Sequence, residues 1–157
     1  MNKYPMTVKG YASLKAEFEH LKKVERPEII EAIAVARDHG DLSENAEYHS
    51  AREKQGFIEG RIAELEEKIG KAEVIDPTEL SGTKVMFGAT VVVFDEDTEE
   101  ELKYQIVGQD ESDIKSGKLS IGAPLSRALI SKNVGDAFEV KTPKGAKSYE
   151  IISVEFI

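Results

Sequence analysis

The sequence predicts an α+β chain, with an N-terminal antiparallel helical hairpin followed by a small domain of strands that includes one short helix. Two observations support this fold class. Apolar residues recur at heptad spacing on both sides of a polar segment near residue 41, and after residue 76 the pattern changes to alternation rich in β-branched residues. We therefore expect two domains, residues 1–75 and residues 76–157.

The first arm of the hairpin carries apolar residues at Tyr11, Leu14, Phe18, Leu21, Ile29 and Ile33. Thr7 precedes this series and is a suitable N-cap for the first helix. Pro27 falls inside the series, where a proline removes a backbone hydrogen bond and usually distorts a helix. The heptad register also slips there, so we expect a bend and not a break, because the apolar pattern resumes at Ile29.

The second arm has the heptad spacing of a coiled coil and should end near residues 70–72. With Gln55 filling one place in the series, its apolar positions are Tyr48, Ala51, Ile58, Ile62, Leu65, Ile69 and Ala72. Facing residues of an antiparallel hairpin have a constant sum of residue numbers, and this sum is 83 for Tyr11–Ala72, Leu14–Ile69, Phe18–Leu65 and Leu21–Ile62. We therefore expect the arms to pack together around a tip at residues 40–43, each arm running roughly 45 Å.

The C-terminal domain should begin after a linker at residues 76–78. Candidate strands cover residues 84–87, 89–94, 102–107, 138–140 and 149–156. The acidic run at residues 95–101 is typical of a solvated hairpin connection. Residues 124–130 predict a short helix with proline at its first position, closed by residues 133–135. The aromatic residues of this domain are most simply core residues: Tyr104, Phe138, Tyr149 and Phe156.

Composition limits the possible functions. The chain has no cysteine, which excludes disulfides and thiolate metal sites and fits a reducing cytosol. No apolar run approaches the ~20 residues of a membrane span, so we expect a cytoplasmic protein without a membrane partner. The net charge is −9, divided as −3 for residues 1–75 and −6 for residues 76–157. Any action on nucleic acid must therefore be local, or pass through a partner that already holds the nucleic acid.

Asp41 and Glu44 are the candidate metal ligands. Hard divalent cations prefer carboxylate oxygens, and Mg²⁺ is commonly held by one or two carboxylates together with several waters. The Asp-x-x-Glu spacing also fits a capping box, with Asp41 as the N-cap and Glu44 satisfying backbone donors at the third position. The two roles are compatible, because a capping side chain still exposes a carboxylate oxygen.

Arg37 and Arg52 are the candidate cations beside the tip. They could form a small positive face suited to a phosphate or an RNA backbone. The alternative is a set of salt bridges within the hairpin, to Glu31, Asp38 or Glu53. His39 and His49 also flank the tip, where solvated histidines are commoner than transition-metal ligands.

A long segment at the tip resembles a known family. It includes Arg-Pro-Glu-Ile-Ile-Glu-Ala-Ile at residues 26–33 and Gly-Asp-Leu-Ser-Glu-Asn-Ala-Glu-Tyr-His within residues 36–62. These residues resemble the signature of the Gre family of bacterial transcript cleavage factors, in its GreA form more than its GreB form. Residues 85–91, 104–108, 124–129 and 134–136 resemble the second domain of that family. Ala123 stands where the family pattern has serine, and Ser131 where it has glycine.

The resemblance implies a mechanism as well as a fold. The hairpin would enter the secondary channel of RNA polymerase, where Asp41 and Glu44 help position a catalytic Mg²⁺ and its water. Arg37 and Arg52 would face the backtracked 3′ end of the nascent RNA. The second domain would be an FKBP-like antiparallel sheet with a short helix that docks at the channel rim. The protein would then be a monomeric stimulator of the polymerase's own transcript cleavage, and no enzyme itself.

Three other functions fit parts of the sequence less well. An inhibitor that blocks the channel on the same fold has no need of the Asp41–Glu44 pair. A prolyl isomerase needs an apolar, aromatic-lined pocket, whereas the second domain has scattered aromatics and the chain has no tryptophan. A chaperone would expose apolar residues at the hairpin tip, where Leu42 is the only large apolar residue between Asp38 and Glu47.

Overall fold

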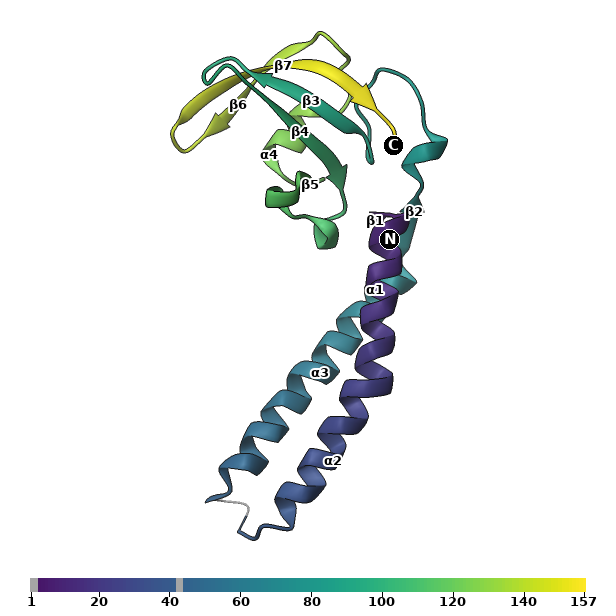
Figure 1. Ribbon diagram of the computed structural model, residues 1–157, viewed down its shortest axis with the longest axis vertical. Helices are drawn as coiled ribbons and strands as arrows, with labels where there is room; N and C mark the ends of the chain where they lie inside the picture. Colours follow the sequence, from purple (N-terminus) through teal and green to yellow (C-terminus); the bar gives the residue numbers. More distant parts are fainter. Residues whose placement is uncertain (1–2, 42–43) are drawn as a thin grey trace. The chain divides into compact units, whose positions relative to one another are not determined.

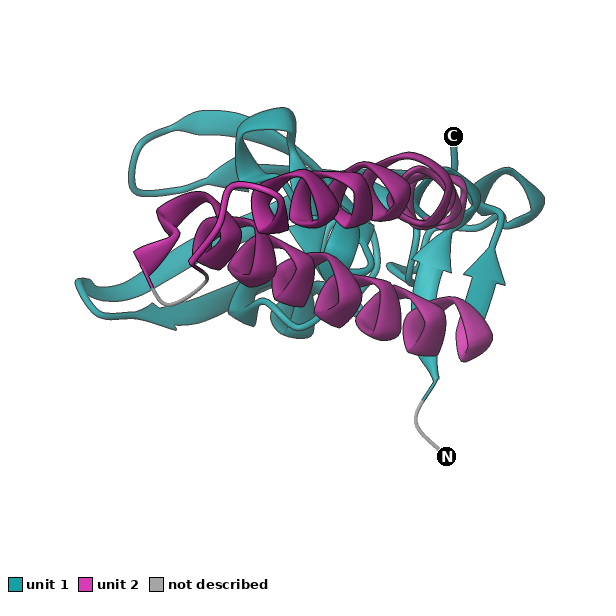
Figure 2. Cartoon of the chain, turned by 90° about the horizontal axis from the view of Figure 1, so that it is seen from below, with its two compact units in different colours: residues 1, 3–10, 73–157 teal, residues 2, 11–72 magenta. Residues whose placement is uncertain are grey.

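The computed structural model describes residues 3–41 and 44–157, which form two compact units (Figures 1 and 2). One unit contains Tyr11–Ala72, and the other contains Lys3–Gly10 together with Glu73–Ile157. The expected division after residue 75 left out this N-terminal segment of the second unit. In the described ranges, no helix combines the length and apolar character that a membrane span requires.

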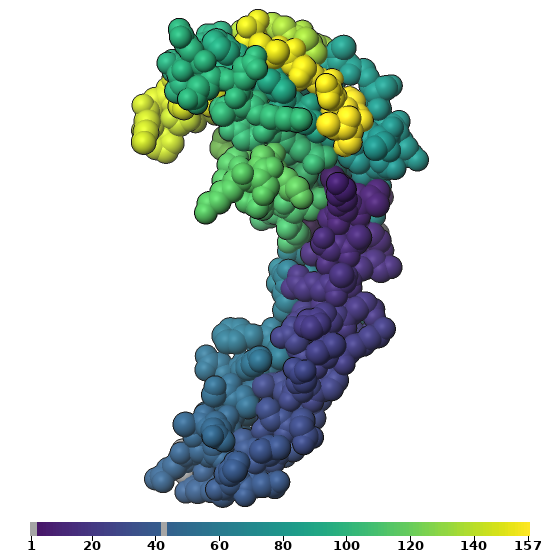
Figure 3. Space-filling model, in the orientation of Figure 1, coloured from purple at the N-terminus to yellow at the C-terminus, as the bar shows by residue number. Residues whose placement is uncertain are grey.

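The first unit is a helical hairpin. Its first arm consists of α1 (Val8–His20), a π-helical turn η1 (Leu21–Glu25) and α2 (Arg26–Arg37), and its second arm is α3 (Ala46–Gly70). Figures 1 and 2 both show the arms side by side, and their side chains meet along the hairpin in the space-filling view (Figure 3). The expected N-cap is confirmed, because Thr7 Oγ1 accepts the N–H of Gly10 at 3.1 Å.

The turn η1 explains the slip in the heptad register. The N–H of Arg26 donates to the carbonyl of Leu21, five residues earlier, so one extra residue is wound into the helix. Pro27 follows at the start of α2, where its missing N–H and its ring are hard to fit into a regular α-helical ladder. Because Glu25 and Arg26 keep right-handed helical dihedrals, the helix continues through the turn, as expected.

The seam between the arms is a single buried apolar stripe. Its buried members are Leu14, Leu21, Ile29, Ile33, Ala36, Ile58, Ile62 and Leu65. Two bidentate ion pairs cross the seam: Arg61 donates to Glu17 at 2.7 and 2.9 Å, and Arg26 donates to Glu59 at 2.8 and 2.7 Å. Ion pairs this exposed contribute little stability, but their geometry favours this alignment of the two arms. The antiparallel hairpin is therefore confirmed.

The second unit contains a five-stranded sheet of order β5-β4-β3-β7-β6. Its strands are β3 (Thr90–Asp95), β4 (Glu100–Val107), β5 (Lys118–Ser120), β6 (Ala137–Thr142) and β7 (Gly145–Glu155). All pairs are antiparallel except β4–β5, which is parallel, so the sheet is mixed. The α+β fold class is confirmed, although the expected sheet was entirely antiparallel.

Four of the five expected strands fall on β3, β4, β6 and β7, and the acidic run connects β3 to β4 as a hairpin. The expected strand at residues 84–87 is wrong, because Lys84 forms an isolated bridge with Asn133. Two short strands, β1 (Tyr4–Thr7) and β2 (Ala72–Ile75), pair in a separate sheet that the sequence pattern did not predict. Each strand is only four residues long and is completed by its partner in space, so its local pattern was a weak signal.

The short helix α4 (Pro124–Leu129) is confirmed, with proline in its first turn. Ala123 occupies its N-cap and supplies no side-chain hydrogen bond, as its methyl side chain requires. Ser131 has a φ of +77°, in the left-handed region where glycine is favoured. The strain at this position explains why glycine was the expected residue.

The core of the second unit lies between the sheet and α4. The buried residues of this core are Val85, Ala89, Val91, Val93, Ile106, Leu119, Leu129, Phe138, Val140, Tyr149 and Ile151. Phe138 and Tyr149 stack with their ring centroids 5.7 Å apart, and Tyr104 and Phe156 pack partly buried against the cluster. Phe138 and Tyr149 are therefore core residues, as expected, and Tyr104 and Phe156 pack at the edge of the core.

The seam residue Leu65 should carry much of the hairpin's stability. Its side chain is 0% exposed, so Leu65→Ala should lower the free energy of unfolding by about 2–5 kcal/mol. Phe57 on the same helix is 71% exposed, and Phe57→Ala is the matched control with a change within about 0.5 kcal/mol. Denaturant unfolding followed by the helical circular dichroism signal measures both, and equal effects would contradict the position of the seam.

The Glu17–Arg61 pair should make the hairpin sensitive to acid. The hydrogen bonds from Arg61 lower the pKa of Glu17 below its ordinary value of 4.5. The folded form then binds fewer protons than the unfolded chain, so the stabilisation is present above pH 4.5 and is lost as the pH falls through the lowered value. Glu17→Gln should make the melting temperature fall less steeply as the pH is lowered through this range. Glu53→Gln, at an exposed position of α3, is the control and should leave the pH dependence of the melting temperature as in the wild type.

Candidate functional site at the hairpin tip

The tip segment, residues 38–45, joins α2 to α3 and holds both candidate metal ligands. Asp41 and Glu44 are exposed. They line one open hollow of about 480 Å³ together with His39, Asn45, Ala46 and Glu47. Residues 42–43, which belong to the expected tip, lie outside the described residues. The structure thus brings the two predicted acids to one surface and adds Glu47, which the sequence analysis did not single out.

The N-cap of α3 is Asn45 and not Asp41. The helix begins at Ala46, and Asn45 Oδ1 accepts the N–H of Tyr48 at 3.0 Å. Asparagine is among the most favourable N-cap residues, and its place directly before the second apolar series was the signal that could have identified it.

The two candidate cations are exposed and lie on different arms, next to the tip segment. The Arg37 guanidinium lies 5.9 Å from the centre of the Tyr48 ring, a cation–π distance. Arg52 donates to the side-chain oxygen of Gln55 at 3.1 Å. Within residues 3–41 and 44–157, neither arginine forms an ion pair with a carboxylate. The salt-bridge alternative is therefore wrong for the described residues.

The histidines near the tip have ordinary surface contacts. His39 lies 4.0 Å from the Glu47 carboxylate, at the limit of an ion pair, and both side chains are largely exposed. The His49 ring meets the Tyr48 ring edge-on, with centroids 5.5 Å apart. Across the described part of the chain, no group of three or more histidine, aspartate or glutamate side chains could hold a metal ion. A closed transition-metal cage is not present in that part of the protein.

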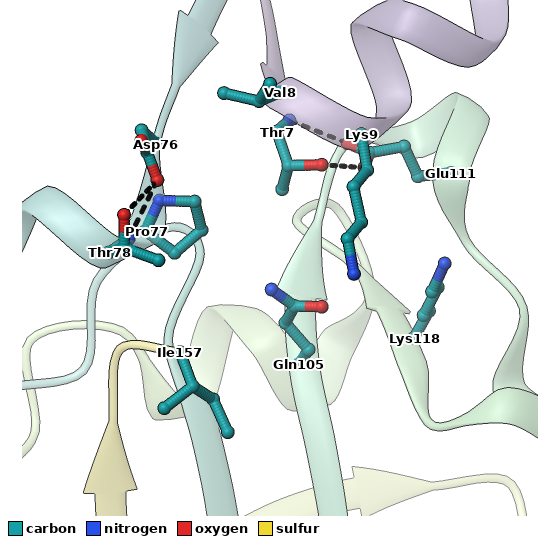
Figure 4. Close-up of a pocket in the computed structure, with 10 residues that line it drawn as sticks. All are labelled: Thr7, Val8, Lys9, Asp76, Pro77, Thr78, Gln105, Glu111, Lys118 and Ile157. Atoms are coloured by element: carbon teal, nitrogen blue, oxygen red, sulfur yellow. Dashed lines mark hydrogen bonds between the residues drawn. The ribbon is translucent and has the colours of Figure 1, made fainter.

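A second hollow, of about 390 Å³, lies in the other unit (Figure 4). Its lining consists of Thr7, Val8, Lys9, Asp76, Pro77, Thr78, Gln105, Glu111, Lys118 and Ile157, none of which is aromatic. The two acids are engaged within the protein. Asp76 accepts from the backbone and hydroxyl of Thr78, which lowers its pKa, and Glu111 accepts from the backbone and hydroxyl of Thr7. This hollow does not resemble the aromatic pocket that a prolyl isomerase needs.

Comparisons with known families agree along nearly the whole chain. Residues 4–74 match the family model described as transcription elongation factor, N-terminal. Residues 80–156 match the model described as transcription elongation factor, GreA/GreB, C-terminal.

Individual relatives agree with the family models. The transcription elongation factor GreA of Caulobacter vibrioides is 63% identical over 157 residues, covering 100% of both chains. The GreA of Maricaulis maris is 62% identical over 156 residues, covering 99% of each. Among solved structures, GreA factor homolog 1 of Thermus thermophilus is 24% identical with a TM-score of 0.45, covering 98% of this chain and 99% of that one. A GreA/GreB structure from Nitrosomonas europaea is 24% identical with a TM-score of 0.43, covering 98% and 100%.

The tip acids should be dispensable for folding, because Asn45 caps α3. Asp41→Ala and Glu44→Ala should each change the free energy of unfolding by no more than about 0.5 kcal/mol. Asn45→Ala should cost about 0.5–2 kcal/mol, since it removes the cap acceptor. Denaturant unfolding of the three variants checks this order. A loss for Asp41→Ala as large as that for Asn45→Ala would return the capping role to the acid.

Proposed function

The chain belongs to the GreA/GreB family of transcription elongation factors, and from this premise we propose that it rescues backtracked, arrested RNA polymerase. The hairpin would enter the secondary channel of the polymerase, and its tip would stimulate the polymerase's own cleavage of the nascent RNA 3′ end. The observation that carries the proposal is the exposed pair Asp41 and Glu44 on one surface of the tip segment, with the cap of α3 supplied by another residue.

The donor set at the tip fits a shared Mg²⁺ site. Mg²⁺ takes oxygen ligands, is often held by one or two carboxylates, and keeps several waters. Asp41 and Glu44 would hold the ion from the hairpin side, and the polymerase active centre would supply the remaining protein ligands. When bound, the ion supplies an activated water and stabilises charge at the phosphate. Two exposed carboxylates suffice for such a role, although they would bind Mg²⁺ weakly by themselves.

The arginines beside the tip support a role toward RNA. Arg37 and Arg52 are exposed, and neither is committed to a carboxylate among the described residues. The cation–π contact with Tyr48 holds Arg37 at the end of α2 without neutralising its charge. In a protein with a net charge of −9, such uncommitted cations can contact phosphate locally. We propose that both arginines contact the displaced 3′ segment of the backtracked RNA.

The second unit would dock the factor on the polymerase at the rim of the channel. The sheet and α4 form a self-contained core, and the acids in the hollow of this unit are occupied by internal hydrogen bonds. The two proposed activities therefore reside in different parts of the chain: docking in residues 76–157 and stimulation of cleavage in residues 1–75. We propose that the factor acts as a monomer and has no nuclease activity of its own.

Removal of either tip acid should abolish stimulated cleavage. Asp41→Ala and Glu44→Ala should still bind polymerase, because binding involves surfaces that the substitutions leave intact. The assay follows cleavage of labelled RNA in backtracked complexes at limiting Mg²⁺, with competition against the wild-type factor as the measure of binding. Asp38→Ala is the matched control, since Asp38 is an exposed acid near the tip that does not line the hollow. Wild-type cleavage by both acid variants, or robust RNA hydrolysis by the isolated chain, would contradict the shared site.

Arg37→Ala combined with Arg52→Ala should weaken action on complexes with an extruded RNA tail. Each charge-assisted contact to phosphate is worth about 1.5–3 kcal/mol, and less where solvent screens it. The Mg²⁺ dependence of cleavage should stay unchanged, because the arginines act on RNA and not on the metal. Lys15→Ala combined with Lys54→Ala removes the same charge from exposed positions on the two arms and should have little effect. Normal cleavage by the arginine variant, without crosslinks from the RNA 3′ end to this face, would refute the RNA contact.

A further inference from the structure

The side chain of Asn45 contacts both helices that flank the tip segment. Its Nδ2 amide donates to the backbone carbonyl of Ala36, in the last turn of α2, at 2.6 Å. Its Oδ1 accepts from the N–H of Tyr48, in the first turn of α3, at 3.0 Å. One short side chain therefore joins the end of one arm to the start of the other.

The two hydrogen-bond partners of Asn45 need different groups: the Ala36 carbonyl needs a donor, and the Tyr48 N–H needs an acceptor. A rotated amide would set its oxygen against the Ala36 carbonyl and its NH₂ group against the Tyr48 N–H, so the hydrogen-bond network itself assigns the orientation. Aspartate and serine are also good N-cap residues. A carboxylate has no donor for Ala36, and a serine that caps Tyr48 has no amide with which to reach it. Among the common N-cap residues, asparagine alone serves both helices.

These bonds close the tip segment at its base. Ala36 is buried and Asn45 is half-buried, whereas Asp41 and Glu44, which lie between them in the chain, are exposed. Glu44 directly precedes Asn45, so its backbone leads into a residue held by both arms. Tyr48, which donates to Asn45, also carries the Arg37 guanidinium over its ring. The same contacts therefore hold the residue that follows Glu44 and one of the cations.

We propose that Asn45 is the positioning residue of the tip, holding the base of the tip segment closed so that Asp41 and Glu44 reach the polymerase active centre in one fixed arrangement. This inference rests on the proposed role of the two acids in transcript cleavage. A misplacement of about 1 Å in a catalytic constellation can cost on the order of a hundredfold in rate. Opening the base should therefore slow cleavage itself and raise its Mg²⁺ requirement, while the hairpin still enters the channel.

The test uses Asn45→Ser and Asn45→Asp in the full chain, because both keep an N-cap acceptor and lose the donor to Ala36. The serine variant is neutral, so it separates loss of the donor from the effect of an added charge. Single-turnover cleavage is measured on backtracked complexes across factor and Mg²⁺ concentrations. We expect the maximal rate to fall about tenfold or more and the half-saturating Mg²⁺ concentration to rise, with the half-saturating factor concentration unchanged. Ser13→Ala and Ser13→Asp, on an exposed residue of α1 outside the tip segment, are the controls for a neutral and a charged substitution.

A purely structural role makes a different prediction. It gives lower thermal stability with a wild-type cleavage rate once the factor is saturating, and that result would overturn the proposal. Amide hydrogen exchange in the free protein is a second test. The amides of the tip segment should exchange faster in Asn45→Ser than in the wild type, while those in the middle of α3 stay protected. Unchanged exchange at the tip would also overturn it.

The variant Asp41→Ala, measured in the same assay, separates the two proposals. If Asp41→Ala cleaves normally, the proposed function of the acids fails. If it loses cleavage while the Asn45 variants keep the wild-type rate and Mg²⁺ dependence, the proposed function stands and the positioning role alone fails.

Discussion

The hairpin depends on one constraint: within the described residues of the Tyr11–Ala72 unit, each arm buries its apolar residues against the other arm. A single stripe from Leu14 to Ala36 on the first arm faces Ile58, Ile62 and Leu65 on the second. Every other residue on the arms is consequently free to be polar, charged or functional. Apolar burial supplies the stability of such a pair, while the flanking bidentate ion pairs contribute mainly to its alignment. The alignment in turn decides which residues arrive at the tip.

Much of the fold could be predicted because it rests on periodicity over long stretches. The heptad series and the constant sum of facing residue numbers identified both arms, and the strand pattern identified β3, β4, β6 and β7. The strands that the sequence pattern did not predict share a physical origin. β1, β2 and β5 are three or four residues long, and they exist because a neighbouring strand completes their hydrogen bonds. Local sequence carries little information about pairing of that kind.

The same limit applies at the tip. The acids stood out from their spacing and from the family resemblance, but Asn45 was not recognised as the residue that caps α3. Asp41 and Asn45 are both competent N-cap residues by composition. What distinguishes Asn45 is its additional bond to Ala36, nine residues earlier on the other arm, which forms only when the two arms pack together. Local rules for helix capping cannot weigh a partner that only the folded hairpin provides.

The wide turn at Leu21–Glu25 has a consequence for how such hairpins can change over evolution. The spacing of buried residues grows from seven, between Leu14 and Leu21, to eight, between Leu21 and Ile29. Inserting a residue into an ordinary helix rotates everything beyond it by about 100°, which would turn the apolar stripe away from its partner. A π-helical turn absorbs the insertion locally and leaves both ends in phase. The first arm therefore contains one residue more than a regular α-helix would need, and it still presents the same apolar face to the second arm.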